Sequence, residues 1–219
     1  FRAGWGALAA VWALLLAVYP MLAATTRMAG ASADDWPPRR PTLHAFDFLH
    51  HEQRPDLASL PYFREAEMLD WIRAHVPPGD TVAEAAWVTS GETYVGGYDF
   101  NGRVASLAGR PVPLGWAHHE RQWRGPAAHA MLLERQHAID RLYMASTSIA
   151  AREAAAELGV RWVLYGVLEH DRYAVRGGLG PRVLNVLGQA GRLAAAFPRE
   201  APAVFLFDFR PEGSTVVAP

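Results

Sequence analysis

The sequence of 219 residues contains no cysteine. Disulfide bonds, thiolate metal sites and a cysteine nucleophile are therefore excluded. The absence fits a reducing and an oxidising compartment equally well. A chain of this length is sufficient for one domain with its own core and an appendage, but not for two large domains.

An excess of charge of either sign is also absent, because 21 basic residues face 22 acidic ones and the net charge is −1. No field of the whole molecule draws the chain to a polynucleotide, and no nucleic-acid partner is expected. The sequence has no nucleophile elbow, P-loop or dinucleotide fingerprint, and "RGGLGP" is a lone glycine turn. We therefore expect no cofactor.

One long apolar run stands out at the start of the chain. Ala3 to Ala24 reads "AGWGALAAVWALLLAVYPMLAA" and contains no charged residue. This length is enough to cross a hydrocarbon core of roughly 30 Å and predicts a transmembrane helix over residues 1–24. A signal peptide would begin with Met and a basic region. Because the chain begins with Phe1, we expect it to be part of a longer protein; a buried core helix is the remaining alternative.

The rest of the chain predicts a linker and one α/β domain. Residues 25–41 have no periodicity and contain several Pro residues, which indicates a juxtamembrane linker; the domain covers residues 42–219. Its expected elements are a helix in "YFREAEMLDWIRAHV", a strand in "TVAEAAWV", a long loop over residues 89–113, helices in "AAHAMLLERQHAIDRLYM" and "STSIAAREAAAELG", a strand in "VRWVLYG", a helix in "PRVLNVLGQA", and paired strands in "RLAAAFP" and "AVFLFDF". This order predicts a small mixed sheet with packed helices, preceded by one transmembrane helix.

Several segments together resemble a membrane-protein family. "TLHAFDFL", "VAEAAWVTSGETY", "GRVASLAGRPVPLGWAHHERQWRG", "RWVLYGVLEHDRY" and "AVFLFDF" follow one another as at the C-terminal end of the YYY-domain polytopic membrane proteins. That family is similar to the GT-C glycosyltransferases, which take sugars from polyprenyl-phosphate carriers. The pattern G-W-x-x-H-E-x-Q-W-R-G, from Gly115 to Gly125, is the most specific part. His44 and Ala45 stand where the family usually has an Asp-Gly pair.

The resemblance implies a membrane location, with residues 1–24 as the last of many spans and an extracytoplasmic domain after it. It implies membrane lipid, the remaining spans of the full-length protein and a polyprenyl-phosphate-linked sugar or glycan as partners. Catalytic carboxylates of GT-C enzymes lie on an early loop, outside this chain. Whether the full-length protein is an enzyme stays open; if it is one, it is a membrane glycosyltransferase.

The segment "GWAHHERQWRG" has three interpretations. Glu120 and Arg124 form an i,i+4 pair if the segment is helical, and the indoles of Trp116 and Trp123 then serve as core anchors. Alternatively, a guanidinium there binds a phosphate or carboxylate while an indole stacks on a sugar ring. Acid–base chemistry by His119 with Glu120 is the third interpretation.

Other candidate binding residues lie on both sides of this segment. Glu84 stands in an apolar strand, so its carboxylate needs a partner, for which Arg103 and Arg124 are the candidates. Glu169 and Tyr173 follow the end of a strand, where open α/β sheets place ligands. The complete set of candidate substrate-binding residues comprises Glu84, Tyr94, Arg103, Trp116, His119, Glu120, Trp123, Arg124, Glu169 and Tyr173.

No metal site is expected. The HExxH spacing fails because Trp123 stands at its last position, and adjacent His118 and His119 point about 100° apart on a helix. Asp47 and His51 share an i,i+4 spacing but reproduce no known ligand set. The sequence thus favours a domain that helps to bind a lipid-linked sugar or glycan, and the alternative is a structural or partner-binding module that binds no such ligand.

Overall fold

The computed structural model describes residues 63–90, 93–94, 100–197 and 204–210, together with Trp12 and Val18. The chain divides into two units, Phe1–His44 and Ala45–Pro219, and the fold below belongs to the second. The span predicted over residues 1–24 lies outside the described part apart from Trp12 and Val18, as does the predicted linker. None of the helices in the described part is long and apolar enough to cross a membrane.

The core of the domain contains a four-stranded mixed sheet. Its strands stand in the order β1 (Val82–Ala83), β4 (Trp162–Tyr165), β6 (Val204–Asp208) and β5 (Arg192–Phe197). The first pair is parallel and the other two are antiparallel, which confirms the mixed sheet and the paired closing strands. A separate two-stranded ribbon joins β2 (Thr89–Ser90) and β3 (Thr93–Tyr94) within the expected long loop.

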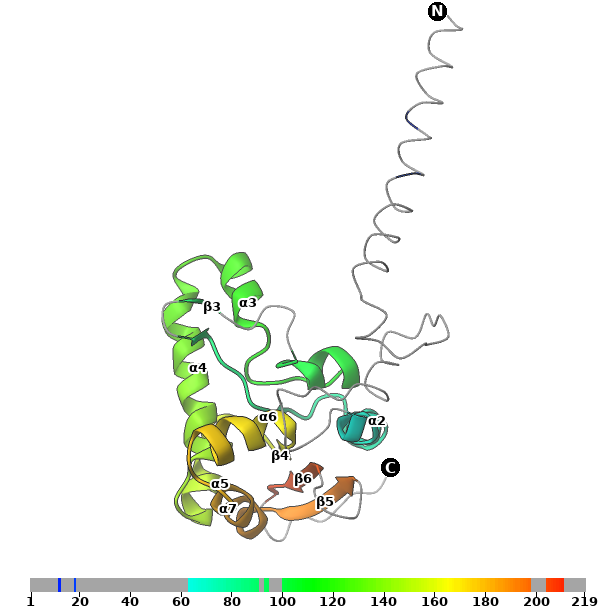
Figure 1. The fold of residues 1–219 in the computed structure, drawn as a ribbon, viewed down its shortest axis with the longest axis vertical. Coiled ribbons are helices and arrows are strands. Elements are labelled where there is room, and N and C mark those ends of the chain that lie inside the picture. The colour runs from blue at the N-terminus through cyan, green and yellow to red at the C-terminus, as the bar shows by residue number, and fades with distance from the viewer. Residues whose placement is uncertain are drawn as a thin grey trace, which may run out of the picture. The chain divides into compact units, whose positions relative to one another are not determined.

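Helices surround the sheet. They are α2 (Phe63–His75), η2 (Val104–Ala108), α3 (Ala117–Arg124), α4 (Ala128–Tyr143), α5 (Ser148–Glu157), α6 (Val167–Glu169), η3 (His170–Arg176) and α7 (Arg182–Ala190), where η marks a π-helical turn. Figure 1 shows α4, α5 and α7 on one side of the sheet and α2 on the other.

The alternation of side chains along β4 explains this three-layer arrangement. Trp162 and Leu164 pack against the layer that contains α2, whereas Val163 and Tyr165 pack against the layer of α4, α5 and α7. Successive residues of a strand point to opposite faces, so a strand that is apolar at every position is covered on both sides. The apolar run "WVLY" therefore requires helices on both faces, and all four of its residues are buried.

Both ends of α5 have residues that suit a helix end. The hydroxyl of Thr147 accepts a hydrogen bond from the Ala150 amide at 3.2 Å and caps the start of α5. The same helix is followed by Gly159, whose φ of +65° is in the left-handed region that favours glycine. The helices expected in the segments of α2, α4, α5 and α7 are likewise confirmed.

Two segments differ from expectation. The strand expected across "TVAEAAWV" is limited to Val82 and Ala83, because later amides in this segment bond to side chains instead of a neighbouring strand. The Ala85 amide donates to Glu169 and the Val88 amide to Gln136. The turns α6 and η3 were not expected; Glu169, three residues into the first, accepts the Gly166 amide and so stabilises its start.

Two leucines on neighbouring strands provide a test of the three-layer core. Leu206 on β6 is fully buried against the α2 layer, whereas Leu193 on β5 is 51% exposed. We expect Leu206→Ala to lower the free energy of unfolding by about 2–5 kcal/mol, because it removes buried methyl groups and leaves a cavity. Leu193→Ala, the matched control, is expected to cost under about 1 kcal/mol. Chemical denaturation measures both, and equal losses would contradict the assignment of faces.

Candidate functional site

Four buried charged side chains meet beside the sheet. The guanidinium of Arg103 donates from Nε to Glu65 at 3.0 Å, from Nη1 to Glu84 at 3.0 Å and from Nη2 to Glu169 at 2.7 Å. All four side chains are 0% exposed. We name Arg103 and these three glutamates the carboxylate hub.

Each member of the hub comes from a different element. Glu84 directly follows β1, and Glu169 ends α6, the turn that directly follows β4. Because β1 and β4 are parallel, their carboxyl ends meet at one edge of the sheet and bring these two glutamates together. Glu65 reaches the hub from the first turn of α2, and Arg103 precedes η2. The hub thus lies where open α/β sheets usually place a ligand.

Backbone amides complete the hydrogen bonding of the carboxylates. Glu169 accepts from the amides of Ala85 at 2.5 Å and Gly166 at 2.8 Å in addition to the guanidinium. Glu65 accepts from the Val167 amide at 2.6 Å. Glu84 receives only a long bond, because the Val104 amide lies 3.3 Å from both of its oxygens. Among the three carboxylates of the hub, Glu84 therefore has the weakest hydrogen bonding from backbone amides.

The contact between α2 and the hub depends on a glycine. A Cβ atom placed on Gly166 would lie 2.1 Å from Oε1 of Glu65, closer than any real contact. The φ of Gly166 is −130°, so its backbone is ordinary and its importance is only steric. Gly166 leaves the space in which Glu65 reaches the Val167 amide.

The hub carries more negative than positive charge when all of its groups are ionised. Burial raises the pKa of Glu84 to about 8, against the opposing attraction of Arg103. Burial likewise raises the pKa of Glu65. Burial opposes the charge of Arg103, but the three nearby carboxylates hold its pKa well above the usual range. The hub therefore keeps its guanidinium charged and holds a proton on its carboxylates at neutral pH.

Tyrosines surround the hub on the side of α4. The hydroxyl of Tyr143 lies 3.1 Å from the Ala83 carbonyl and 2.7 Å from the Leu164 carbonyl, and so connects α4 to both parallel strands. Burial raises the pKa of Tyr143 well above its usual range, so this hydroxyl stays protonated. Its ring stacks on that of Tyr173 with centroids 4.8 Å apart.

Tyr173 belongs to a second polar cluster. Its hydroxyl donates to Asp140 at 2.8 Å, and Arg172 pairs with the same carboxylate at 3.0 Å. The guanidinium of Arg172 also lies over the ring of Trp87. Glu169 and Tyr173 are only four positions apart in the sequence, but their side chains belong to separate clusters.

The segment "GWAHHERQWRG" forms α3, and its rings follow one another along the helix. The centroids of Trp116 and His119 are 5.8 Å apart, and those of His119 and Trp123 are 6.0 Å apart. Trp116 donates from Nε1 to the Asn101 carbonyl at 2.6 Å, which attaches α3 to the chain two residues before Arg103. Trp123 at the other end is 81% exposed.

Charged side chains accompany these rings on α3. Glu120 lies 3.5 Å from Arg124, as the i,i+4 spacing predicts, and 3.6 Å from Arg135 of α4. The side chain of Arg124 is 57% exposed. The exposed end of α3 therefore presents an indole and a guanidinium at consecutive positions. We name Trp123 and Arg124 the α3 surface.

The structure separates the ten candidate residues into groups. Glu84, Arg103 and Glu169 meet in the hub, and Arg103 is the partner that Glu84 was expected to need. Tyr173 is buried beside Asp140, and Tyr94 lies in β3, its side chain outside the described part. The remaining candidates lie on or next to α3 and comprise Trp116, His119, Glu120, Trp123 and Arg124.

Sequence reasoning missed one hub residue, Glu65. A signal for it exists, since Glu65 shares a helical face with the apolar residues Met68, Leu69 and Ile72. A carboxylate on the buried face of a helix requires a partner, as was argued for Glu84.

In the described part of the chain, no three or more His, Cys, Asp or Glu side chains are placed to hold a metal ion. Asp47 and His51 lie outside the described residues.

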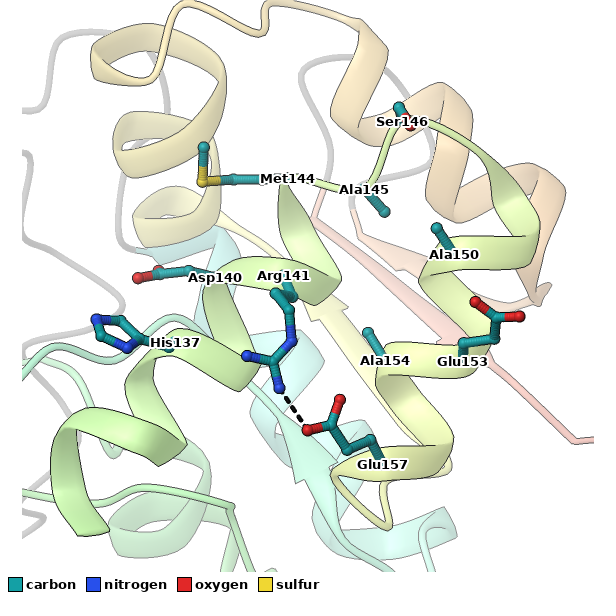
Figure 2. Close-up of a pocket in the computed structure, with 10 residues that line it drawn as sticks. All are labelled: His137, Asp140, Arg141, Met144, Ala145, Ser146, Ala150, Glu153, Ala154 and Glu157. Atoms are coloured by element: carbon teal, nitrogen blue, oxygen red, sulfur yellow. Dashed lines mark hydrogen bonds and ion pairs between the residues drawn. The ribbon is translucent and has the colours of Figure 1, made fainter. Parts of the chain in front are cut away.

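A groove of about 580 Å³ lies between α4 and α5, and none of the ten candidates lines it. Figure 2 shows its walls, with Asp140 and Arg141 on α4 and Glu153 and Glu157 on α5. Arg141 and Glu157 point toward one another across it and form an ion pair. Small alanine side chains lie between these walls.

Comparisons with known proteins give no further information on the site, since no family model, curated protein or solved structure matches this chain.

Replacing the central guanidinium tests the structural importance of the hub. We expect Arg103→Met to lower the free energy of unfolding by about 3–5 kcal/mol, because it leaves buried carboxylates without their counter-charge. Arg141→Met, which breaks the exposed pair with Glu157, is the control and is expected to cost under about 1 kcal/mol. Urea denaturation of both variants provides the measurement; a similar small loss in both would contradict a stabilising hub.

The raised pKa of Glu84 predicts how stability depends on pH. The group has its ordinary pKa of 4.5 in the unfolded chain and a value of about 8 in the folded one, so the folded state binds more protons between these values. Stability is therefore fully present below pH 4.5 and decreases as pH rises through 8, by up to about 1.4 kcal/mol per pH unit for one proton. Denaturation curves between pH 5 and 9 test this, and Glu84→Gln should flatten the dependence.

Proposed function

We propose that this chain is the C-terminal part of a GT-C-like polytopic membrane protein. In this proposal its last span precedes an extracytoplasmic domain that helps to bind a lipid-linked sugar or glycan, and catalysis takes place elsewhere in the full-length protein. The family resemblance of the "GWAHHERQWRG" pattern and the apolar run over residues 3–24 support the membrane location. The α3 surface supports the binding role.

The exposure of Trp123 is the observation on which the binding role rests. A tryptophan buries a large apolar area in most folded domains, and here 81% of the residue is exposed. The flat indole face suits the C–H face of a pyranose ring. Arg124 beside it offers a planar guanidinium fork, which matches a phosphate or carboxylate in two parallel hydrogen bonds. A sugar phosphate combines both features in one molecule.

The position of the carboxylates argues against a catalytic role for the hub. A general acid or base must lie within hydrogen-bonding reach of the proton that it transfers. Glu84 and Glu169 are fully buried, and both of them bond to Arg103. In this proposal the hub supports the fold and α3 contacts the ligand.

The hub also favours a second candidate, a structural or partner-binding module of a membrane protein. Three of the ten candidate ligand contacts bond to one another in the interior. If the α3 surface binds no sugar phosphate, the exposed indole remains available to another protein chain, because Trp and Arg are enriched at the energetic centres of protein interfaces.

Substitutions on the α3 surface separate ligand binding from folding. The full chain in detergent micelles is titrated with a polyprenyl-phosphate-linked hexose. We expect Trp123→Phe and Arg124→Lys each to weaken binding about tenfold, which corresponds to 1.4 kcal/mol, because the first shrinks the stacking face and the second removes the fork. The melting temperature should change little, since both side chains are exposed.

Two variants serve as controls for this titration. Gln122→Ala alters an exposed neighbour on α3, and Arg141→Lys makes the same change of cation on α4. Both should bind as the unmodified chain does. Equal affinity of all four variants, or no binding of the hexose by the unmodified chain, would refute the role of the α3 surface and leave the structural module.

A further inference from the structure

The hub is the polar connection between the start of α2 and the rest of the domain. The carboxylate of Glu65 accepts hydrogen bonds from Arg103 and from the Val167 amide. The other end of α2 is held differently, because Arg110 donates to the carbonyls of Arg73 and Val76, both at 2.6 Å. The two ends of the helix therefore depend on separate interactions, and only the first involves the hub.

Charge balance makes the hub dependent on a proton. Arg103 is the only cation that forms an ion pair with Glu65, Glu84 or Glu169 in the described part of the chain. The other titratable groups that face the hub are Tyr143 from α4 and Tyr165 from β4, and they contribute no positive charge. Ionisation of every carboxylate leaves two uncompensated negative charges in a site without solvent, where like charges repel strongly.

The hydrogen bonds indicate where the proton resides. Glu169 accepts three hydrogen bonds from N–H groups, and each oxygen of Glu65 has a donor of its own, at 2.6 Å and 3.0 Å. Oε1 of Glu84 has only the shared Val104 amide at 3.3 Å. A protonated carboxyl needs an oxygen that is not already occupied by donors, so Glu84 is the member that carries the proton.

We propose that the hub is a proton-dependent latch that holds the first half of α2 against the sheet. With the proton present, Glu65 stays bound beside Gly166 and α2 is docked. When the proton leaves Glu84, repulsion among the three carboxylates is relieved by moving one of them into water. Glu65 is the one that moves, because α2 forms the outer layer, whereas Glu84 follows a strand and Glu169 is held by three donors.

The apolar contacts of α2 determine how far it moves. Met68, Leu69 and Ile72 still favour the docked position, and Arg110 still holds the last turn. The latch therefore opens the first turns of the helix and does not unfold the domain. Glu67 and Asp70 face solvent already, so the released turns carry charge that water solvates.

Hydrogen exchange of the full chain, followed by mass spectrometry at pH 6 and pH 9 and corrected for the intrinsic rate, tests this latch. We expect the protection of residues 65–70 to fall by at least tenfold more than that of α5 between pH 6 and pH 9, because α5 follows only the pH dependence of global unfolding. Glu84→Gln cannot lose a proton and should keep α2 protected at both pH values. Glu67→Gln, on the exposed face of the same helix, is the matched control and should behave as the unmodified chain.

A second variant keeps the latch testable if Glu84→Gln does not fold. Gly166→Ala fills the space that Glu65 occupies, so it should leave the start of α2 unprotected at pH 6 as well as at pH 9. Equal protection of α2 at both pH values in the unmodified chain would overturn the latch, and so would an equal loss in α2 and α5, which indicates global unfolding. None of these outcomes depends on whether α3 binds a sugar phosphate.

Discussion

One guanidinium shared among three buried carboxylates is the interaction on which this fold depends. Arg103 has its donors directed at Glu65, Glu84 and Glu169, which belong to an outer helix and to the ends of two parallel strands. Apolar packing alone can be satisfied by many slightly different arrangements, whereas a buried charge tolerates few. The hub thereby fixes how α2, the sheet and η2 meet. Arg103 thus connects the carboxyl ends of the two parallel strands to the outer helix α2.

The hub fills the usual ligand position of an open α/β sheet with side chains of the chain itself. In open α/β sheets, ligands bind outside the carboxyl ends of the parallel strands. Here the guanidinium of Arg103 fills that position. It bonds to Glu84 and Glu169 as a cationic ligand would. The exposed indole of Trp123 and guanidinium of Arg124 lie instead on α3, and Trp116 before that helix is attached to the Asn101 carbonyl, two residues before Arg103. The hub supports the segment from which the α3 surface extends.

The sequence predicted the elements well because their signals are local. A helical period, a Thr cap and a glycine in the left-handed region define α5, and apolar density defines β4. The reasoning that a carboxylate in an apolar strand needs a cation also found the pair of Glu84 with Arg103. What local patterns do not contain is which distant groups meet. Glu65 was missed, and Trp116 and Trp123 looked equivalent, because exposure depends on neighbours that periodicity along one segment does not specify.

The parallel pairing of β1 with β4 has a consequence for how the chain acquires this structure. Val82 pairs with Trp162, 80 positions later in the chain, and the hub contacts join residues 19, 38 and 66 positions apart. Helices α4 and α5 come between these two strands in the sequence, and their first turns form from residues that are close along the chain. Loop-closure entropy delays contacts between distant residues. These separations predict that assembly runs outward from the middle of the chain and that Arg103 is desolvated late, when its carboxylate partners are in place.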